Sequence, residues 1–289
     1  MKAKDLYKKL DAYFELEKCR DDWRDMDFNE FIADNFKQRY MGLVLDNSQN
    51  IVQVYTAVFP SDKVLNKILN SKKEDILLFT HHPMIWDSSR SGYPFKDINK
   101  SLLIKLRERK ISLYSLHVPL DRNGEYSTAV SLAKAISIIP ENEFYEYFGV
   151  KAGIIGKTNS KTIVDLAQKV SGIVGHRVKI WNYGTAKINK QQVALVAGGG
   201  NSPEAIREVA GFGINVFVTG VTLPNKNYKP SIKFHELARA SKINVIGATH
   251  YSTEKFACQA VVKYFKKLNL PAVFISDEPN FNDLDEMNH

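Results

Sequence analysis

Cysteine is scarce in this chain, with only Cys19 and Cys258 among 289 residues. The two lie far apart and lack metal-type spacing, which argues against a disulfide framework and favours a reducing compartment. Long apolar runs are also absent, since none approaches the roughly 18 residues that a membrane span needs. The N-terminus has helix-spaced apolar residues in place of the apolar centre of a signal peptide. We therefore expect a cytoplasmic protein.

Charge is unevenly distributed, because the last residues of the chain carry acidic side chains without any Lys or Arg. The formal net charge is +8, but residues 276–289 hold five acidic residues and no Lys or Arg, which puts the preceding residues at +13. A basic body could attract phosphate-bearing small molecules or nucleic acid. No groove-reading motif and no basic stripe interleaved with aromatic residues is present, so a solvated lysine-rich surface is the simpler interpretation. A nucleic-acid partner therefore has charge but no motif in its favour.

Short β-branched runs alternate with helical patterns, which is typical of an α/β fold with mixed sheets flanked by helices. The sequence predicts strands at residues 52–58, 75–80, 111–116, 192–197, 214–219 and 243–247. Helices are predicted from Ser61 and over residues 101–110, 203–210 and 233–241. With 44% hydrophobic residues, the chain can bury an apolar core in each half.

The two halves show the same order of features. A strand, a helix and a further strand precede "HVPLD" at residues 117–121 and "HYSTE" at residues 250–254, and both segments read His-x3-acid. This weak internal repeat predicts two related α/β lobes, residues 1–140 and 141–289, the second ending in the acidic tail. The stretch from about Pro140 to Asn159 is expected to be the connection between them.

Four of the seven histidines directly follow predicted strands. His81 and His82 come after "DILLFT", His117 after "ISLYSL" and His250 after "INVIGA". Ligands of open α/β sheets bind beyond the carboxyl ends of the strands, so we expect these imidazoles at a binding edge. A lone histidine is more often an ordinary hydrogen-bonded residue, and this interpretation is given to the remaining three: His176, His235 and His289.

Two carboxylates complete the pattern, because Asp121 and Glu254 each lie four residues beyond a strand-end histidine. Glu254 is expected in the first turn of a helix capped by Ser252, where the helix dipole favours the ionised form. Imidazole with carboxylate suits Zn, Mn, Fe, Co or Ni, and the absence of cysteine argues against a structural zinc site. Five or six donors exceed the three that one catalytic zinc takes and fit two ions about 3.5–4 Å apart.

The segments that carry these residues are "FTHHPMIW", "YSLHVPLD" and "GATHYSTE". In this order they resemble the signature of the dinuclear-metal GTP cyclohydrolase I type 2 homologues, also called Nif-three-like proteins. The match runs from about Val44 to Lys267 and includes "VALVAGGGNS" and "VFVTG". The resemblance implies two α/β lobes with the metal site in the cleft between them, commonly assembled into a homohexamer.

By matching position, the resemblance implies five metal ligands: His81, His82, Asp121, His250 and Glu254. It makes His117 a further ligand, a residue that orients a ligand, or a proton shuttle, and His117 is the candidate catalytic residue. The chain departs from the family pattern at Val221, where an acidic residue is common. It also has Thr249 where a glycine directly precedes the histidine in many relatives.

Two functions are consistent with these residues. The first is a hydrolase with two divalent metal ions per chain that acts on a nucleotide or another phosphate-bearing substrate, with GTP cyclohydrolase-like activity suggested by the family name. The alternative is a non-catalytic metal-binding regulatory or scaffold protein that binds protein or nucleic-acid partners. The glycine-rich "AGGGNSPE" at residues 197–204 lacks P-loop and dinucleotide-binding spacing, so a tight structural turn is favoured over a phosphate site.

Overall fold

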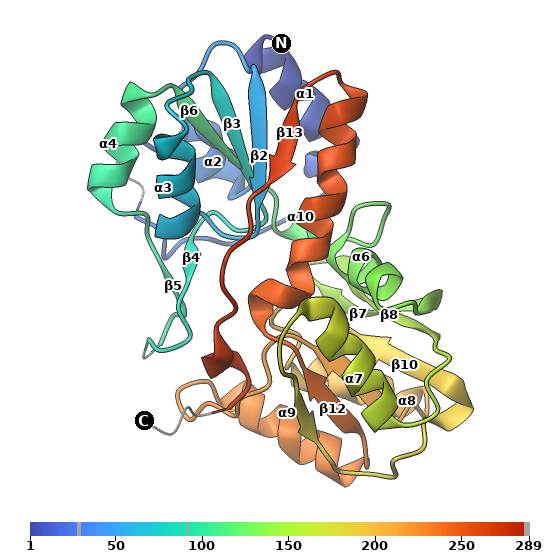
Figure 1. The fold of residues 1–289 in the computed structure, drawn as a ribbon. Coiled ribbons are helices and arrows are strands. Elements are labelled where there is room, and N and C mark those ends of the chain that lie inside the picture. The colour runs from blue at the N-terminus through green and yellow to red at the C-terminus, as the bar shows by residue number, and fades with distance from the viewer. Residues whose placement is uncertain (28–29, 91, 286–289) are drawn as a thin grey trace. The chain divides into compact units, whose positions relative to one another are not determined.

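Two mixed sheets organise the protein, as a computed structural model shows for residues 1–27, 30–90 and 92–285 (Figure 1). The chain divides into two units. The first unit comprises residues 1–120 and 258–277, and the second comprises residues 121–257 and the chain from residue 278 onward. The α/β fold with mixed sheets flanked by helices is therefore confirmed. No helix within the described ranges combines the length and apolar character that crossing a membrane requires.

The first unit is built on a five-stranded sheet in the order β1-β6-β3-β2-β13, as far as the described residues show. β1 runs antiparallel to β6, and the other neighbours are parallel. The strands are β1 (Gly42–Leu45), β2 (Gln53–Ala57), β3 (Ile76–Thr80), β6 (Ile111–Ser115) and β13 (Ala272–Phe274), with the small hairpin β4 (Ile85–Trp86) and β5 (Phe95–Lys96). The helices are α1 (Ala3–Tyr13), η1 (Leu16–Lys18), α2 (Asp34–Arg39), α3 (Asp62–Asn70) and α4 (Lys100–Glu108).

The central strands of this sheet are buried on both faces. Successive side chains of a strand point to opposite sides, so an unbroken apolar run such as "ILLF" in β3 needs cover on each side. Leu78 packs with residues of α3 and α4 on one face. On the other face the ring of Phe79 lies 6.2 Å from Phe14 and 5.5 Å from Phe265.

The second unit has a six-stranded sheet in the order β7-β8-β10-β11-β12-β9 within the described part of the chain. β10, β11 and β12 are parallel, and β7, β8 and β9 run antiparallel to their neighbours. The strands are β7 (Ile139–Tyr147), β8 (Val150–Lys157), β9 (Lys179–Trp181), β10 (Gln192–Leu195), β11 (Val216–Thr219) and β12 (Asn244–Gly247). The helices are α6 (Thr128–Ala135), α7 (Ile163–Val174), η2 (Asn189–Gln191), α8 (Pro203–Gly211), α9 (Lys229–Ala240) and η3 (Phe281–Asp283). Two of the three unit boundaries fall within helices, α5 (Val118–Asp121) and α10 (His250–Lys267), and the third lies between Asp277 and Glu278.

The parallel strands of the second unit are covered in the same way. Leu195 and Val218 pack with residues of α6 and α7 on one face. Phe217 and Val245, which alternate with that set, pack with residues of α8 and α9 on the other. Because β10, β11 and β12 are parallel, their carboxyl ends lie at one edge of the sheet, where the loops that carry candidate ligands begin.

All six predicted strands are present, as β2, β3, β6, β10, β11 and β12, and each lies within its predicted range. Residues 140–159, which were expected to connect the two lobes, mostly form the hairpin β7–β8 of the second sheet, and the sequence did not predict these two strands. β7 lies at the sheet edge and exposes most of its side chains, including Ile139 at 68%. An edge strand of this kind lacks the apolar run that identifies a buried strand in a sequence.

Candidate metal centre

Three histidines of the first unit form a compact group, here called the histidine triad: His81, His82 and His117. His81 and His82 follow β3 directly, and His117 lies two residues beyond β6. Each contributes one ring nitrogen to a set whose members lie within 4.8 Å of one another. The rings of His81 and His82 have centroids 4.2 Å apart and planes at 66°. Because the strand has ended, these adjacent residues do not point to opposite faces but meet in one place.

Hydrogen bonds of two members of the triad, His81 and His117, indicate which ring nitrogen carries the proton. His81 Nδ1 lies 2.9 Å from the carbonyl oxygen of Leu116, which can only accept, so Nδ1 is the donor. His117 Nδ1 lies 3.2 Å from Oδ1 of Asp21, whose side chain is 1% exposed. In both neutral rings the basic lone pair is therefore on Nε2. A histidine held by a carbonyl or carboxylate through its other nitrogen is typical of protein metal sites.

The second unit supplies an imidazole and a carboxylate, here called the His–Glu pair: His250 and Glu254. Both project from the first turns of α10, and His250 Nε2 lies 3.1 Å from Glu254 Oε1. Their side chains are only 5% and 4% exposed. Asp121, at the end of α5, accepts a 2.8 Å hydrogen bond from the hydroxyl of Thr128 in the same unit. Buried histidine and glutamate side chains that could hold a metal ion are thus present in the protein.

The start of α10 differs from the prediction. The helix begins at His250 and not after Ser252, so Glu254 lies beyond the first turn. Thr249 caps it, since its hydroxyl accepts from Ser252 N at 3.3 Å, while the Ser252 hydroxyl donates to His176 Nε2 at 2.7 Å. Thr249 has a φ of +63°, which is unfavourable for a β-branched residue. Such strain is often found where a functional side chain must be aimed.

Gly198 explains how the His–Glu pair is accommodated. Its φ is +66°, and an added Cβ would lie 2.1 Å from Glu254 Oε1 and 3.1 Å from His250 Nε2. Glycine is therefore needed at this point for the two donor atoms to converge. Two amides of the glycine-rich turn donate to side-chain hydroxyls, Gly198 N to Thr253 and Gly200 N to Thr219. These bonds agree with the interpretation of a structural turn.

The other histidines have ordinary partners in the second unit. His235 donates from Nε2 to the carbonyl oxygen of Thr222 at 2.7 Å, and its Nδ1 lies 2.9 Å from the Tyr183 hydroxyl. Burial lowers the pKa of His235 and, by the same cause, the pKa of His176. His289 lies outside the described residues.

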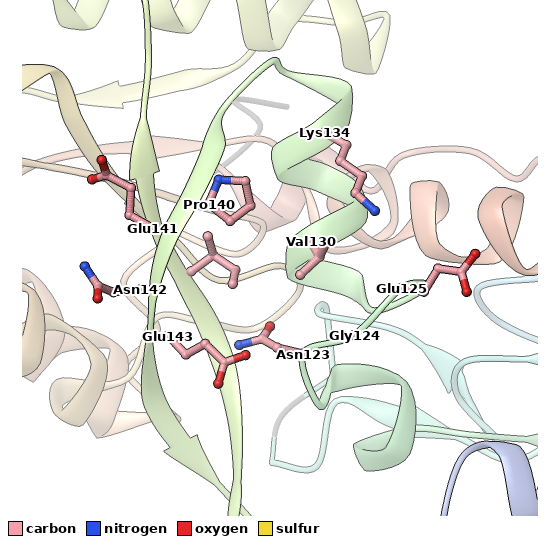
Figure 2. Close-up of a pocket in the computed structure, with 10 residues that line it drawn as sticks. Asn123, Gly124, Glu125, Val130, Lys134, Pro140, Glu141, Asn142 and Glu143 are labelled. Carbon is pink, nitrogen blue, oxygen red and sulfur yellow. The ribbon is translucent and has the colours of Figure 1, made fainter.

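A cavity of about 560 Å³ lies between α6 and the β7–β8 hairpin of the second unit (Figure 2). Its described lining includes Asn123, Val130, Lys134 and Glu143, and none of the predicted site residues. Figure 2 shows the Asn123 and Glu143 side chains turned toward one another, whereas the Lys134 amine points elsewhere. The polar groups do not converge on one point, so the cavity is not a second candidate metal centre.

Sequence reasoning missed three residues of this region. Asp21 lies in an irregular segment before α2 and belongs to no spacing pattern. Asp283, whose carboxylate accepts a hydrogen bond from His250 N at 2.8 Å, lies 33 residues after His250 in the sequence. Gly198 was recognised as part of a tight turn, but nothing in the sequence connects it with Glu254. Only the spatial arrangement reveals these three roles.

Comparison with known proteins identifies relatives along most of the chain. The family model described as Duf34/NIF3 (NGG1p interacting factor 3) matches residues 32–280. A curated protein of Archaeoglobus fulgidus named "GTP cyclohydrolase 1 type 2 homolog" is 30% identical over 243 residues, which cover 83% of this chain and 89% of that protein.

Solved structures agree in fold. The structural-genomics protein ybgI, of unknown function, superposes with a TM-score of 0.74 at 19% identity and covers 97% of this chain and 100% of its own. The protein TTHA1606 from Thermus thermophilus gives a TM-score of 0.68 at 25% identity, covering 97% of this chain and 99% of its own. The fold over nearly all of this chain therefore corresponds to the fold of both solved chains.

Proposed function

The chain belongs to the Duf34/NIF3 family, and from this premise we propose that it is a dinuclear divalent-metal hydrolase acting on a nucleotide or another phosphate-bearing substrate. The proposed ligands are His81, His82, Asp121, His250 and Glu254. The observation that carries the proposal is the histidine triad, in which Leu116 O and Asp21 orient the rings of His81 and His117. The steric fit of Gly198 against the His–Glu pair supports the second half of the ligand set.

The residue types match divalent transition metals. Neutral imidazole and carboxylate oxygen suit Zn, Mn, Fe, Co or Ni, and neither Cys19 nor Cys258 belongs to the donor set. Two ions in such a site would lower the pKa of a bound water so that hydroxide forms near neutral pH. His117 would take up a proton at Nε2, and the Asp21 carboxylate at Nδ1 would hold the ring in place and stabilise its charged form.

The substrate class rests on charge and on relatives. The +13 carried by residues before the acidic tail favours an anionic substrate. The Archaeoglobus relative is named for homology to a GTP cyclohydrolase, which favours a nucleotide. The same apparatus can attack a phosphoester, since fold and metal do not fix the reaction. By the resemblance of its motifs we also propose two related lobes that together hold the metal ions, a homohexamer and a cytoplasmic location.

Metal analysis combined with a substrate screen tests this proposal. Protein supplemented with Zn²⁺ or Mn²⁺ should retain about two ions per chain and turn over at least one nucleotide or phosphoester. Glu254→Gln should keep its fold but lose turnover. Glu236→Gln is the matched control, because Glu236 is an exposed residue of α9 paired with Lys233. Fewer than about one ion per chain after supplementation would refute the metal assignment.

A metal-binding scaffold without turnover is the second candidate, favoured by the words "interacting factor" in the family description. If the protein is a scaffold, the folded Glu254→Gln variant should bind the partner as tightly as the folded wild-type protein does. A nucleic-acid partner would show steep loss of binding with added salt. Turnover that is present in the wild-type protein and in Glu236→Gln but absent in Glu254→Gln would exclude the scaffold.

A further inference from the structure

The last described residues, 280–285, are fixed to the beginning of α10 within the second unit; we call them the C-terminal strap. The Asp283 carbonyl oxygen accepts hydrogen bonds from Thr222 N at 2.7 Å and Leu223 N at 2.9 Å. Asp285 forms an ion pair with Arg177 at 2.8 Å. These contacts distinguish the strap from a solvated acidic tail.

Asp283 makes the contact nearest to the proposed metal centre. Its Oδ2 accepts a hydrogen bond from His250 N at 2.8 Å, and the residue is 0% exposed. Burial of a carboxylate is costly unless it is hydrogen-bonded. Here the carboxylate lies at the N-terminus of an 18-residue helix, where the partial positive charge of the helix end stabilises it. The first amide of α10 is thus held by a residue from the other end of the unit's sequence.

A second set of contacts joins the strap to the same helical turn. The Phe281 ring lies edge-on to His176, with centroids 5.2 Å apart. His176 Nε2 in turn accepts a hydrogen bond from the Ser252 hydroxyl at 2.7 Å, and His176 Nδ1 lies 2.7 Å from Arg177 O. The turn that carries the His–Glu pair is therefore held by the strap directly at His250 and indirectly at Ser252.

We propose that Asp283 is a positioning residue for the His–Glu pair, so that docking of the C-terminal strap sets the affinity of the metal centre. This inference rests on the proposed function. The hydrogen bond fixes the backbone of His250. Small rotations of that backbone would move the imidazole Nε2, which lies 3.1 Å from Glu254 Oε1 in the native protein. The buried carboxylate also adds negative charge behind the ligands, which favours a cation.

Zinc affinity of the full-length protein, measured by competition with a chelator well below the melting temperature, tests the role of Asp283. Asp283→Ala should weaken binding by about 10- to 100-fold, as loss of residues that orient metal ligands does. Asp283→Asn keeps the shape and an acceptor oxygen but loses the charge, so a smaller loss of about 3- to 10-fold is expected. A purely structural role would lower the melting temperature and leave the affinity of the folded protein unchanged.

Asp165→Asn is the matched control. Asp165 also accepts a backbone N–H at a helix start, from Thr162 at 3.0 Å, but it belongs to α7 and touches neither member of the pair. The zinc affinity of Asp165→Asn should equal that of the wild-type protein. If Asp283→Ala fails to fold, Asp283→Asn decides the matter.

Affinity within about 2-fold of wild type in either folded variant would overturn the role of Asp283 alone. Failure of the wild-type protein to bind zinc would overturn the proposed function and this inference together. The two failures are thus distinguished by the wild-type measurement.

Discussion

Substitution of Gly198 by alanine tests whether Glu254 occupies a sterically fixed position. The added Cβ would lie 2.1 Å from Oε1 and 3.0 Å from Cδ of Glu254. Non-bonded atoms need about 3.5 Å, so the carboxylate must move by roughly 1 Å or more. Because the carboxylate is the far end of a flexible side chain, it should yield before the backbone does. The movement separates Oε1 from His250 Nε2, 3.1 Å away in the native protein.

The size of the effect follows from two contributions. A non-glycine residue at a φ of +66° costs about 1–2 kcal/mol. Loss of a hydrogen bond to a charged group costs about 1.5–3 kcal/mol. Gly198→Ala should therefore lower the free energy of unfolding of the metal-free protein by about 2.5–5 kcal/mol. Its zinc affinity should fall as well, since a proposed ligand has been displaced.

Gly213→Ala separates the two contributions. Gly213 has a φ of +69°, and an added Cβ there would meet no described atom within 4 Å. This variant should lose only the conformational share of about 1–2 kcal/mol and keep wild-type zinc affinity. Urea unfolding and chelator competition on both variants provide the comparison. Equal destabilisation and equal affinity in the two variants would refute the steric argument.

Two further outcomes are expected. Burial lowers the pKa of His235 in the folded protein, so the unfolded state takes up the proton at a higher pH than the folded state does. The free energy of unfolding should therefore decrease as the pH is lowered from about 7.5 to 5.5. His235→Gln, which keeps a donor for Thr222 O, should flatten that dependence, and an unchanged slope would exclude His235 as its source. If His117 is a metal ligand, Asp21→Asn should weaken zinc binding about 10-fold, because Asp21 orients the His117 ring. If zinc affinity is unchanged and the pH dependence of turnover is altered, His117 is the proton shuttle.

The strands that carry the site were predictable because they are buried on both faces. Successive positions of a central parallel strand are buried, so β3, β6 and β12 read as short, mainly apolar runs shortly before His81, His117 and His250. The histidines after these runs were therefore recognisable as strand-end residues. β7 escaped recognition for the opposite reason, because an edge strand with one solvent-facing side has no such run.

The start of α10 shows where local sequence rules fail. Ser252 is a good N-cap by residue type, but a hydrogen-bond partner outside the helix, His176, holds its hydroxyl. The cap is Thr249, in a backbone conformation that propensity disfavours. A φ of +63° favours glycine over a β-branched residue at this position. A tertiary contact has overridden the local preference.

The acidic tail illustrates a second limit of sequence reasoning. Net charge treats its carboxylates as equivalent, and a run of acids without Lys or Arg is typical of a solvated segment. In the folded protein Asp283 is buried against an amide of α10, whereas Asp285 lies in an ion pair that is partly exposed. The difference arises because one side chain meets a helix N-terminus and the other meets Arg177. Position relative to α10, and not the charge of the segment, therefore determines which acidic residue can influence the His–Glu pair.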